Sequence, residues 1–492
     1  MQLAVSPNIL VISTLLLGLL NLVISFTSKK DHNTRNFLLI VVSSFFLINI
    51  LIIDWLFLQG VRVQLSFSLF GDFIIGFHLE ALSLIFVTLL SFLWICALLY
   101  TTKYLVINNT PNTGWFLFFL NLSVLSGILI GLSSNLFTMF IFYEILTLST
   151  APLIGHSGGD SVMAGLYKYL KILMLSGMLL FLPAIIIIYA KVGHGNFVPG
   201  GFITDYFTKT YIVFLLLMFI FGIAKAALYP VHQWLPAAMV AHYPVSALLH
   251  AVVVVKSGLF CIYKILLYVF GLRYLHSLSE EFNWLIFIPI VTIFYSSFQA
   301  LKSDNIKKVL ANSTINQLSI ALLSAFMFTP KSMGAAILHL SSHAFTKICL
   351  FYGMGSIYSI KKANQLNDLI GVSQEMPKIS FIILLSSLSL IGIPPFGGFI
   401  SKFYIMLAAA EQNNTLVLGA LAVTSLLSGI YLIKMLSLLY KPALNYRPKE
   451  ASVLLEKKLP ISMFFSLILC CSGIICFYII QIFIKQFFIY IG

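Results

Sequence analysis

The feature that most constrains this chain is a series of apolar windows, each long enough to span a membrane. About 20 apolar residues in a helix cross the hydrocarbon core of a bilayer. Unpaired backbone groups are too costly in lipid, so windows of this length are predicted to be helices. We therefore expect an all-α integral membrane protein with about fourteen transmembrane helices. The windows fall at about 4–26, 37–58, 79–101, 115–133, 135–155, 162–190, 211–229, 243–269, 283–300, 306–328, 332–358, 378–409, 414–440 and 460–489.

Composition agrees with this class. Of the 492 residues, 60% are hydrophobic and 9% are charged, whereas soluble proteins carry about 25% charged residues. The first window has no Lys or Arg before Lys29, so it lacks the basic region of a cleaved signal peptide and reads as the first span. Residues 60–76 instead alternate polar and apolar side chains, which predicts a short hairpin at one membrane face.

Several function classes find no support in the sequence. The net charge of +14 comes from basic residues scattered among apolar segments, which does not favour a nucleic-acid partner. The six cysteines form no CxxC pair, and there is no phosphate-binding or dinucleotide-binding glycine motif. We expect no cofactor and no redox or hydrolytic site, so enzymatic activity stays open only as that of a larger proton-pumping complex.

Lys and Arg are concentrated on alternate connections between the windows. This bias predicts the face that lies in the cytoplasm, and it places both chain termini on the opposite face. A bacterial inner membrane is the expected location.

Residues 222–258 combine buried charge with helix interruptions. Lys225 and Lys256 lie in surroundings otherwise suited to lipid, and Pro230 and Pro236 break the segment between them. A lysine in the membrane costs roughly 2.5–3.5 kcal/mol, and a broken helix is tolerated there only where it faces protein or water. The pattern indicates a hydrated path for protons or ions. The alternative is a Pro-kinked helix whose lysines reach back to the membrane surface.

Glu144 is the lone carboxylate within its span. At that depth it must pair with a cation or take up a proton, and Lys225 is the expected partner. Such a pair could take and release a proton as it opens and closes. The alternative is a static ion pair that pins two helices, although buried pairs are poor stabilisers.

His339, His343 and Lys347 recur at intervals of four and are predicted to share one helical face. Two histidines at this spacing can bind a metal, but no acidic third ligand is near, so a proton relay is favoured over a metal site. His250 and Lys256 are expected to extend the relay towards the first broken helix, and Lys402 to end it at a second.

The second break contains Pro394 and Pro395. Lys402 follows it and lies 177 residues after Lys225, while Lys434 lies 178 residues after Lys256. Five helices separate the members of each pair, which is typical of an inverted repeat. The expected divisions are N-terminal helices 1–3 at 1–113, a first five-helix repeat at 114–270, a second at 271–441, and helix 14 at 442–492.

Four other charged groups are interpreted more simply. Glu80 is expected at the membrane interface, Lys264 and Lys434 are expected to reach the surface from helix ends, and Lys168 is either an interface anchor or a buried group.

Six segments resemble the antiporter-like membrane subunits of respiratory complex I and of the Mrp-type cation/proton antiporters. They cover most of the chain between the fourth and twelfth windows. They are FYEIL at 142–146, KAALYPVHQWLPAAM at 225–239, PVSALLHAVVVVKSG at 244–258, DNIKKVLANSTINQ at 304–317, HAFTKICLFYGMG at 343–355 and GIPPFGGFISKF at 392–403.

The resemblance implies a fourteen-helix bundle with two inverted five-helix repeats and broken helices 7 and 12. It implies proton-transfer roles for Glu144, Lys225, Lys256 and Lys402. A lysine at 402, where M-type complex I subunits have glutamate, favours the N-type or the D-type Mrp protein. Ala237 departs from many complex I subunits, which have aspartate there, and so favours the D-type Mrp protein.

The leading hypothesis is a proton-translocating subunit of a multi-subunit Na⁺(cation)/H⁺ antiporter, close to the D-type Mrp protein. Its expected partners are other membrane subunits, the lipid bilayer and protons, with sodium left open. One alternative is an N/M-type proton-pumping subunit of respiratory complex I (NADH:quinone oxidoreductase) or of a membrane-bound hydrogenase. An alternative of another class is a stand-alone secondary transporter of an organic solute, which would need a polar pocket at the helix breaks.

Overall fold

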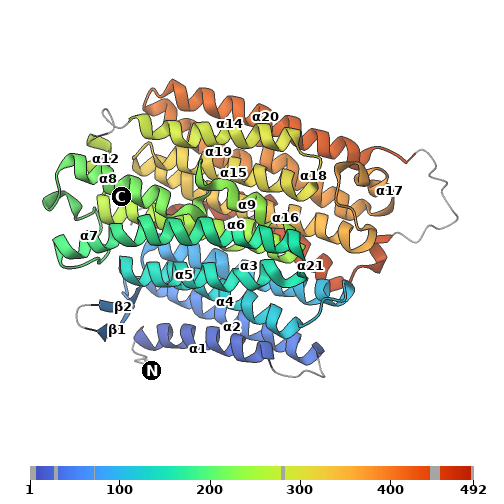
Figure 1. Cartoon of the computed structure of the whole chain (residues 1–492), viewed down its shortest axis with the longest axis horizontal. Coiled ribbons are helices and arrows are strands. Elements are labelled where there is room, and N and C mark those ends of the chain that lie inside the picture. Colours follow the sequence, from blue (N-terminus) through green and yellow to red (C-terminus); the bar gives the residue numbers. More distant parts are fainter. Residues whose placement is uncertain (1–6, 27–31, 71–72, 279–282, 444–454, 489–492) are drawn as a thin grey trace.

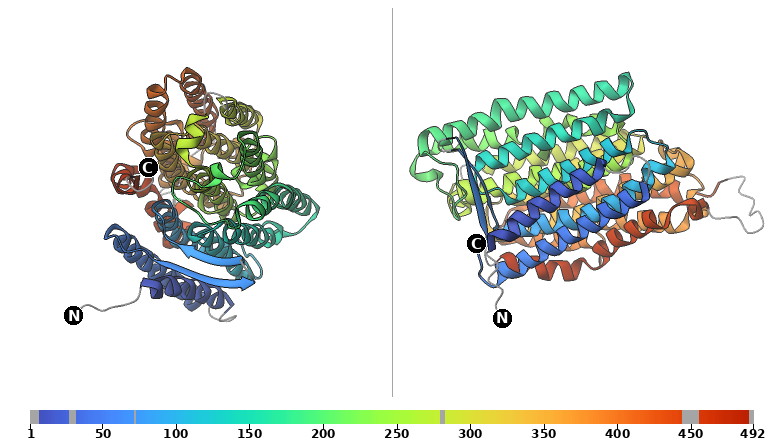
Figure 2. Two further views of the ribbon diagram at one scale, coloured as in Figure 1. Left: turned by 90° about the vertical axis from the view of Figure 1, so that its left-hand side faces the viewer. Right: turned by 90° about the horizontal axis from the view of Figure 1, so that it is seen from below.

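The chain forms a bundle of long helices that run side by side, with a β-hairpin at one end (Figures 1 and 2). The structure is a computed structural model that describes residues 7–26, 32–70, 73–278, 283–443 and 455–488. The hairpin confirms the prediction from alternating residues, with its bounds shifted by a few positions. Strands β1 (Gln64–Phe70) and β2 (Phe73–His78) pair antiparallel, and Gln64 lies opposite His78.

Each of the fourteen predicted windows contains helix. The first described helix begins, and the last ends, at the hairpin end of the bundle (Figure 2). The N-terminal third consists of α1 (Pro7–Phe26), α2 (His32–Leu58), α3 (Ala81–Ile107), α4 (Thr113–Leu132) and α5 (Leu136–Ile154).

The middle third is the most interrupted part of the chain. It comprises α6 (Asp160–Ser176), the π-helix η2 (Gly177–Phe181), α7 (Leu182–Val192), α8 (Lys209–Gly222), η4 (Ala224–Ala226), η5 (Val231–Gln233), α9 (Trp234–Ala237), α10 (Tyr243–Ala247), the π-helix η7 (Leu248–Val252), α11 (Val254–Ile265), the π-helix η8 (Leu266–Phe270) and α12 (Leu272–Ser277).

The C-terminal third contains the longest helix, α16. Its elements are α14 (Phe287–Lys302), α15 (Ile306–Ala325), α16 (Pro330–Lys361), α17 (Val372–Glu375), α18 (Pro377–Ile391), α19 (Gly397–Glu411), α20 (Thr415–Tyr440), α21 (Ile461–Ile475) and α22 (Phe477–Phe488). Short 3₁₀ turns complete the described chain: η1 (Gly155–Ser157), η3 (Ile203–Asp205), η6 (Ala238–Val240), η9 (Asn283–Ile286), η10 (Leu366–Leu369) and η11 (Leu455–Lys458).

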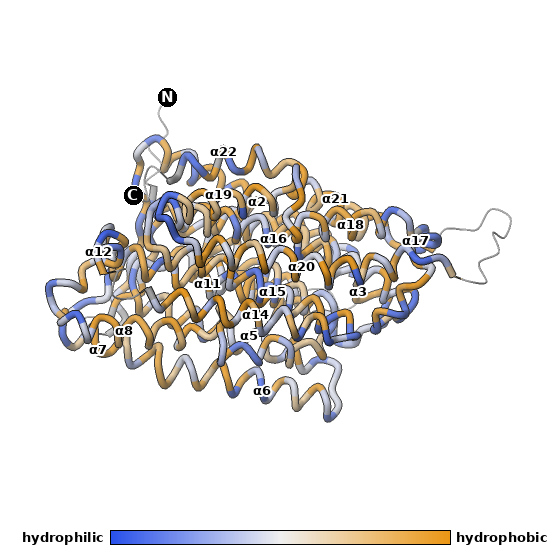
Figure 3. Tube along the Cα trace, turned by 90° about the horizontal axis from the view of Figure 1, so that it is seen from above, coloured by the Kyte–Doolittle hydropathy of each residue, from blue (hydrophilic) through white to orange (hydrophobic). Residues whose placement is uncertain are grey.

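Within the described residues, nine helices are long and apolar enough to cross a membrane, and the bent pair α21–α22 would add a tenth. The other predicted spans coincide with helices that are interrupted, as at α8 and at α18–α19, or rich in polar side chains, as in α15 and α16. The count of fourteen and the division into repeats therefore stay predictions. Apolar residues dominate the helices, and hydrophilic segments gather at both ends of the bundle (Figure 3).

Two elements form the centre of the bundle. The segment Tyr243–Phe270, from α10 to η8, is entirely buried. Helix α16 packs against α10, α11, α15, α18, α19 and α21, and a capping box between Thr329 and Ser332 starts it. A helix enclosed on all sides is normally apolar all round. The histidines and lysines of these two elements are therefore exceptions that require a functional explanation.

Candidate functional site

The first predicted break follows α8, which ends at Gly222. The chain then makes the short turn η4 and enters a left-handed conformation at Ala227 (φ 57°) before Pro230. The indole N–H of Trp234 donates to the carbonyl of Ala224 at 2.9 Å, which ties the two sides of the break together. The backbone here is irregular but enclosed by protein, as a membrane requires.

Lys225 lies in this break and is fully buried against α5. Its Nζ donates to the carbonyl oxygen of Tyr143 at 2.8 Å and to Thr147 Oγ1 at 2.5 Å. The ammonium also lies 3.1 Å from the centre of the Tyr143 ring, in a cation–π contact. The freed end of α8 thus presents Lys225 to one face of α5.

Glu144 is buried on the same helix, beside the residues that hold Lys225. It is rotated by about 100° from Tyr143 but lies three residues before Thr147, which makes Glu144 and Thr147 neighbours on the helix surface. Neither carboxylate oxygen of Glu144 has a hydrogen-bond partner among the described protein atoms, and the carboxylate lies against Gly177 in the π-turn η2. Among the described residues no ion pair within 4 Å joins it to Lys225, but the two groups are electrostatic neighbours, so the predicted partners lie near each other without direct contact in this conformation.

Lys256 and His343 meet at the centre of the bundle. Both are buried, and Lys256 Nζ and His343 Nδ1 are hydrogen-bond partners between α11 and α16. Helix α11 also packs closely on the first break, because a Cβ at Gly258 would overlap with the backbone of Lys225 and Ala226. The two lysines therefore lie on elements in direct contact.

The predicted face of α16 is present, with one difference. The rings of His339 and His343 are nearly parallel, 13° apart, with centres separated by 6.4 Å. Lys347 is an electrostatic neighbour of His343, but its Nζ donates to the Leu310 carbonyl at 3.0 Å and to Ser313 Oγ, both on α15.

His250 lies in the π-helix η7 and is also an electrostatic neighbour of His343. It stacks on Phe351, and its Nε2 contacts Met239 Sδ at 3.2 Å. The structure thus brings Lys256 and Lys347 close to the three histidines of the predicted relay, which are His250, His339 and His343.

The second break lies between α18 and α19. Lys402 Nζ donates to the carbonyls of Leu390 and Ile391, at 3.0 and 2.9 Å, which are the last two residues of α18. A cation at this position satisfies free carbonyls and complements the negative end of the helix. The preceding residue, Ser401, hydrogen-bonds His339 Nδ1 at 2.9 Å, so α19 links the histidine face of α16 to the broken helix.

Two charged residues are more central than their positions in the sequence suggest. Sequence places Lys264 at the membrane surface and Glu80 at the interface, but the Lys264 side chain has no exposed area and forms an ion pair with Glu80 at 3.4 Å. The expectation for Lys264 is wrong because α11 is enclosed along its whole length. Its spacing of eight residues from Lys256, which puts both on one side of the helix, is the signal that could have found it.

Lys434, by contrast, is 44% exposed and pairs with Asp304 at 3.1 Å. Its proposed repeat counterpart Lys256 is fully buried. The sequence spacing therefore pairs an interior lysine with a surface lysine, and Lys434 lies outside the site.

A polar cavity of about 530 Å³ adjoins the first break, where α14 ends and α15 begins. Its wall includes His232 and Gln233 of η5, and three lysines make it basic: Lys168, Lys302 and Lys308. This cavity lies away from the hairpin end and gives the break access to that side of the bundle.

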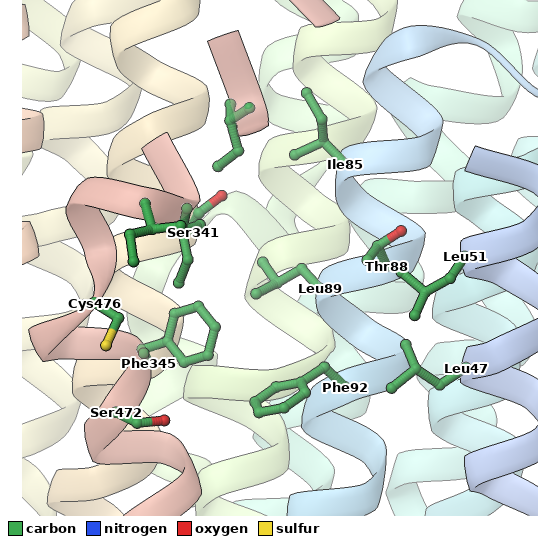
Figure 4. A pocket seen from close by; sticks show the side chains of 14 residues that line it. Leu47, Leu51, Ile85, Thr88, Leu89, Phe92, Ser341, Phe345, Ser472 and Cys476 are labelled. Atoms are coloured by element: carbon green, nitrogen blue, oxygen red, sulfur yellow. The ribbon is translucent and has the colours of Figure 1, made fainter. Parts of the chain in front are cut away.

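A second groove of about 490 Å³ is almost wholly apolar (Figure 4). It lies between α2, α3, α16 and the bent pair α21–α22, and Thr88, Ser341 and Ser472 are its polar exceptions. None of the predicted proton-transfer residues lines it. Within the described residues, no three His, Cys, Asp or Glu side chains gather as a possible metal site.

The part of the chain that holds this site matches a known protein family. The family described as "NADH:quinone oxidoreductase/Mrp antiporter, TM" matches residues 133–428, which include both breaks and all the predicted site residues. A curated relative, "Putative antiporter subunit mnhA2" of Staphylococcus aureus, is 30% identical over an alignment of 394 positions that covers 75% of this chain and 46% of the relative. The chain thus spans about half the length of the curated relatives it matches.

Two solved structures share the fold. A chain of the Mrp complex from Dietzia sp. DQ12-45-1b superposes with a TM-score of 0.81 at 20% identity, covering 100% of this chain and 97% of that one. A chain of the membrane-bound sulfane sulfur reductase, an archaeal respiratory membrane complex, gives 0.79 at 20% identity, covering 99% and 96%. Together with the apolar helices, these matches identify a multi-pass integral membrane protein.

Proposed function

Because the chain belongs to the NADH:quinone oxidoreductase/Mrp antiporter transmembrane family, we propose that it is a proton-translocating membrane subunit of a multi-subunit cation/proton antiporter. The observation that carries this proposal is the contact between Lys256 and His343 in the fully buried centre of the bundle. A lysine and a histidine that share a proton inside the membrane have a high desolvation cost and little stabilising value. Proton transfer accounts for their presence.

The proposed path runs between the two breaks. Protons enter from the basic cavity beside His232 and reach Lys225, then Lys256 on the adjoining helix. From there they pass to His343 and His339. Ser401 and Lys402 complete the path at the end of α18.

The steps of this path that no direct hydrogen bond joins need motion or water. The ring centres of His339 and His343 are 6.4 Å apart, so transfer between them requires ring rotation or a bridging water. Glu144 supplies the other moving part. With Lys225 held by Tyr143 and Thr147, the carboxylate is unpaired, and bringing it to the ammonium would hold the proton on Lys225.

The partners are other membrane subunits, and the exchanged cation is proposed to be sodium. Lys402 and Ala237 favour a member of the D-type Mrp class. The relative in Staphylococcus aureus is named as an antiporter subunit, and it is about twice as long as the part this chain matches. In a redox-driven assembly of the complex I or hydrogenase type, the same path would serve but proton movement would not require sodium.

The proposed orientation places the basic cavity on the cytoplasmic side of a bacterial inner membrane and the hairpin and both termini on the other side. The lysines around the cavity support this orientation, since positive residues accumulate on cytoplasmic faces.

The test uses the assembled complex in vesicles with a pH-sensitive dye, with and without a sodium gradient. Wild type is expected to move protons only when sodium is present. Lys225→Ala is expected to abolish this movement in a complex that still assembles, while Lys434→Ala, a surface lysine, is the matched control and keeps the wild-type rate. Unchanged transport in Lys225→Ala would refute the proposal, and sodium-independent proton movement would favour the redox-driven rival.

A further inference from the structure

A second buried acid–base pair lies at the hairpin end, outside the path between the breaks. Lys264 Nζ lies 3.4 Å from Glu80 Oε2, donates to the carbonyl of Ser133, and contacts Ser83 Oγ at 3.5 Å. The ammonium also faces the rings of Phe197 and Phe260, at 4.6 and 5.7 Å. The attraction within a buried ion pair usually does little more than offset the cost of desolvating its two charges, so stability alone does not explain why this pair is present.

The pair connects stepwise to solvent. Glu80 Oε1 lies 3.8 Å from His78 Nδ1, at the end of strand β2. The exposed fractions of the three side chains rise in order: 0% for Lys264, 10% for Glu80 and 33% for His78. The hairpin is held over this point, because Phe77 bridges to Ser133 and the backbone N–H of Ser134 donates to Gly76.

The pair also shares a helix with the centre of the site. Lys256 and Lys264 both lie on α11, about 12 Å apart along its axis. Phe260 stands midway between them and stacks on Phe86 of α3, with ring centres 4.3 Å apart. The Phe86–Phe260 stack thus lies between the central lysine and the hairpin-side pair.

We propose that Lys264, Glu80 and His78 form a port through which the central lysine exchanges protons with solvent at the hairpin end, with the Phe86–Phe260 stack as its inner barrier. This rests on the proposed function, since it supplies an outlet for the protons carried by Lys256. The other titratable or charged groups facing the pair are Cys261, Tyr268 and, beyond Tyr268, Arg62.

The transfer is balanced in protons and charge. The Lys264 ammonium gives one proton to the Glu80 carboxylate, leaving a neutral amine and a neutral carboxylic acid. The acid passes the proton to the His78 imidazole and becomes a carboxylate again. The imidazolium releases it to water at the hairpin end, and the amine takes its next proton from the Lys256 side.

The test compares charge-matched variants in the assembled complex. The double variant Glu80→Gln/Lys264→Met removes both charges and leaves neither group buried alone. We expect it to assemble like wild type but to move protons at least about tenfold more slowly. Asp54→Asn is the control, a buried carboxylate on α2 that accepts a hydrogen bond from Thr88 and lies outside the route. A double variant that moves protons at the wild-type rate would overturn the port and leave the path between the breaks standing.

Chemical rescue gives a second readout that a structural role would not produce. His78→Gln is expected to slow proton movement, and imidazole in the hairpin-side buffer is expected to restore it, whereas imidazole on the other side has no effect. If His78→Gln moves protons at the wild-type rate, or is slow and not rescued, the port is wrong. If Lys225→Ala in the same vesicles keeps the wild-type rate, the failure lies instead with the proposed function.

Discussion

Lys256 Nζ and His343 Nδ1 are hydrogen-bond partners in the interior of the bundle, where both side chains are buried. They are 87 residues apart in the sequence, and each lies on a helix that also touches a broken helix. The contact joins the half of the site around Lys225 to the half around Lys402. Any proton that crosses between these halves by the proposed path passes through it.

Replacing His343 tests this junction. His343→Gln keeps a side chain that can hydrogen-bond Lys256 but cannot take up a proton, so proton movement should fall on the order of 100-fold. Assembly should be preserved, as judged by co-purification of the partner subunits. His276→Gln, at an exposed position of α12 outside the path, is the comparison and should keep the wild-type rate. Equal rates for His343→Gln and wild type would remove His343 from the path.

Lys402 is expected to matter for stability as well as transfer. Its ammonium satisfies the carbonyls of Leu390 and Ile391, so Lys402→Ala should leave them unpaired and lower the free energy of unfolding by about 1–3 kcal/mol. Lys402→Glu should be worse, because a carboxylate would face two carbonyl oxygens. The readout is thermal unfolding of the purified complex, with Lys434→Ala as the exposed control. A melting temperature unchanged in Lys402→Glu would contradict the capping role.

Gly177 should control the position of the Glu144 carboxylate. A Cβ at residue 177 would overlap with Glu144 Oε1, so Gly177→Ala should displace the carboxylate and change the rate of proton movement without preventing assembly. Gly419→Ala is the matched control, since a Cβ there meets nothing within 4 Å, and it should be neutral or stabilise by about 0.5–1 kcal/mol. Identical proton movement in the two variants would show that the carboxylate position does not matter.

Gly258 should be the least replaceable glycine of the site. Its Cα approaches the backbone of Lys225 and Ala226 so closely that any side chain would force the first break away from α11. We expect Gly258→Ala to lower the amount of assembled complex severely, measured by the yield of intact complex after purification. Normal yield and normal proton movement would show that the two elements need not touch.

Much of the fold can be predicted from the sequence because its strongest signals are local. Each apolar window contains helix, alternation locates the hairpin, and clustered prolines and glycines locate both breaks. The relay face of α16 follows from residues 339, 343 and 347 recurring at helical spacing. These features depend on neighbours in the chain and on the lipid environment.

What sequence cannot supply is the direction of individual side chains. The sequence predicts that Glu144 and Lys225 pair, and the two groups are electrostatic neighbours, but the lysine hydrogen-bonds Tyr143 and Thr147 while the acid lies against Gly177. Glu80 and Lys264 resemble surface groups in the sequence because each is near a helix end. Enclosure by the hairpin and by the connection at Ser133 makes them a buried pair, and that enclosure involves residues far apart in sequence.

The most direct measurement is proton movement by the assembled complex carrying Lys256→Met. Methionine fills a similar volume without a charge, so it removes the proton carrier without leaving a buried ion. The account predicts that the complex assembles like wild type while sodium-linked proton movement falls to background, and that Lys434→Met keeps the wild-type rate. Wild-type proton movement in Lys256→Met would contradict the path, because no proton could then be passing between the two breaks through the Lys256–His343 contact.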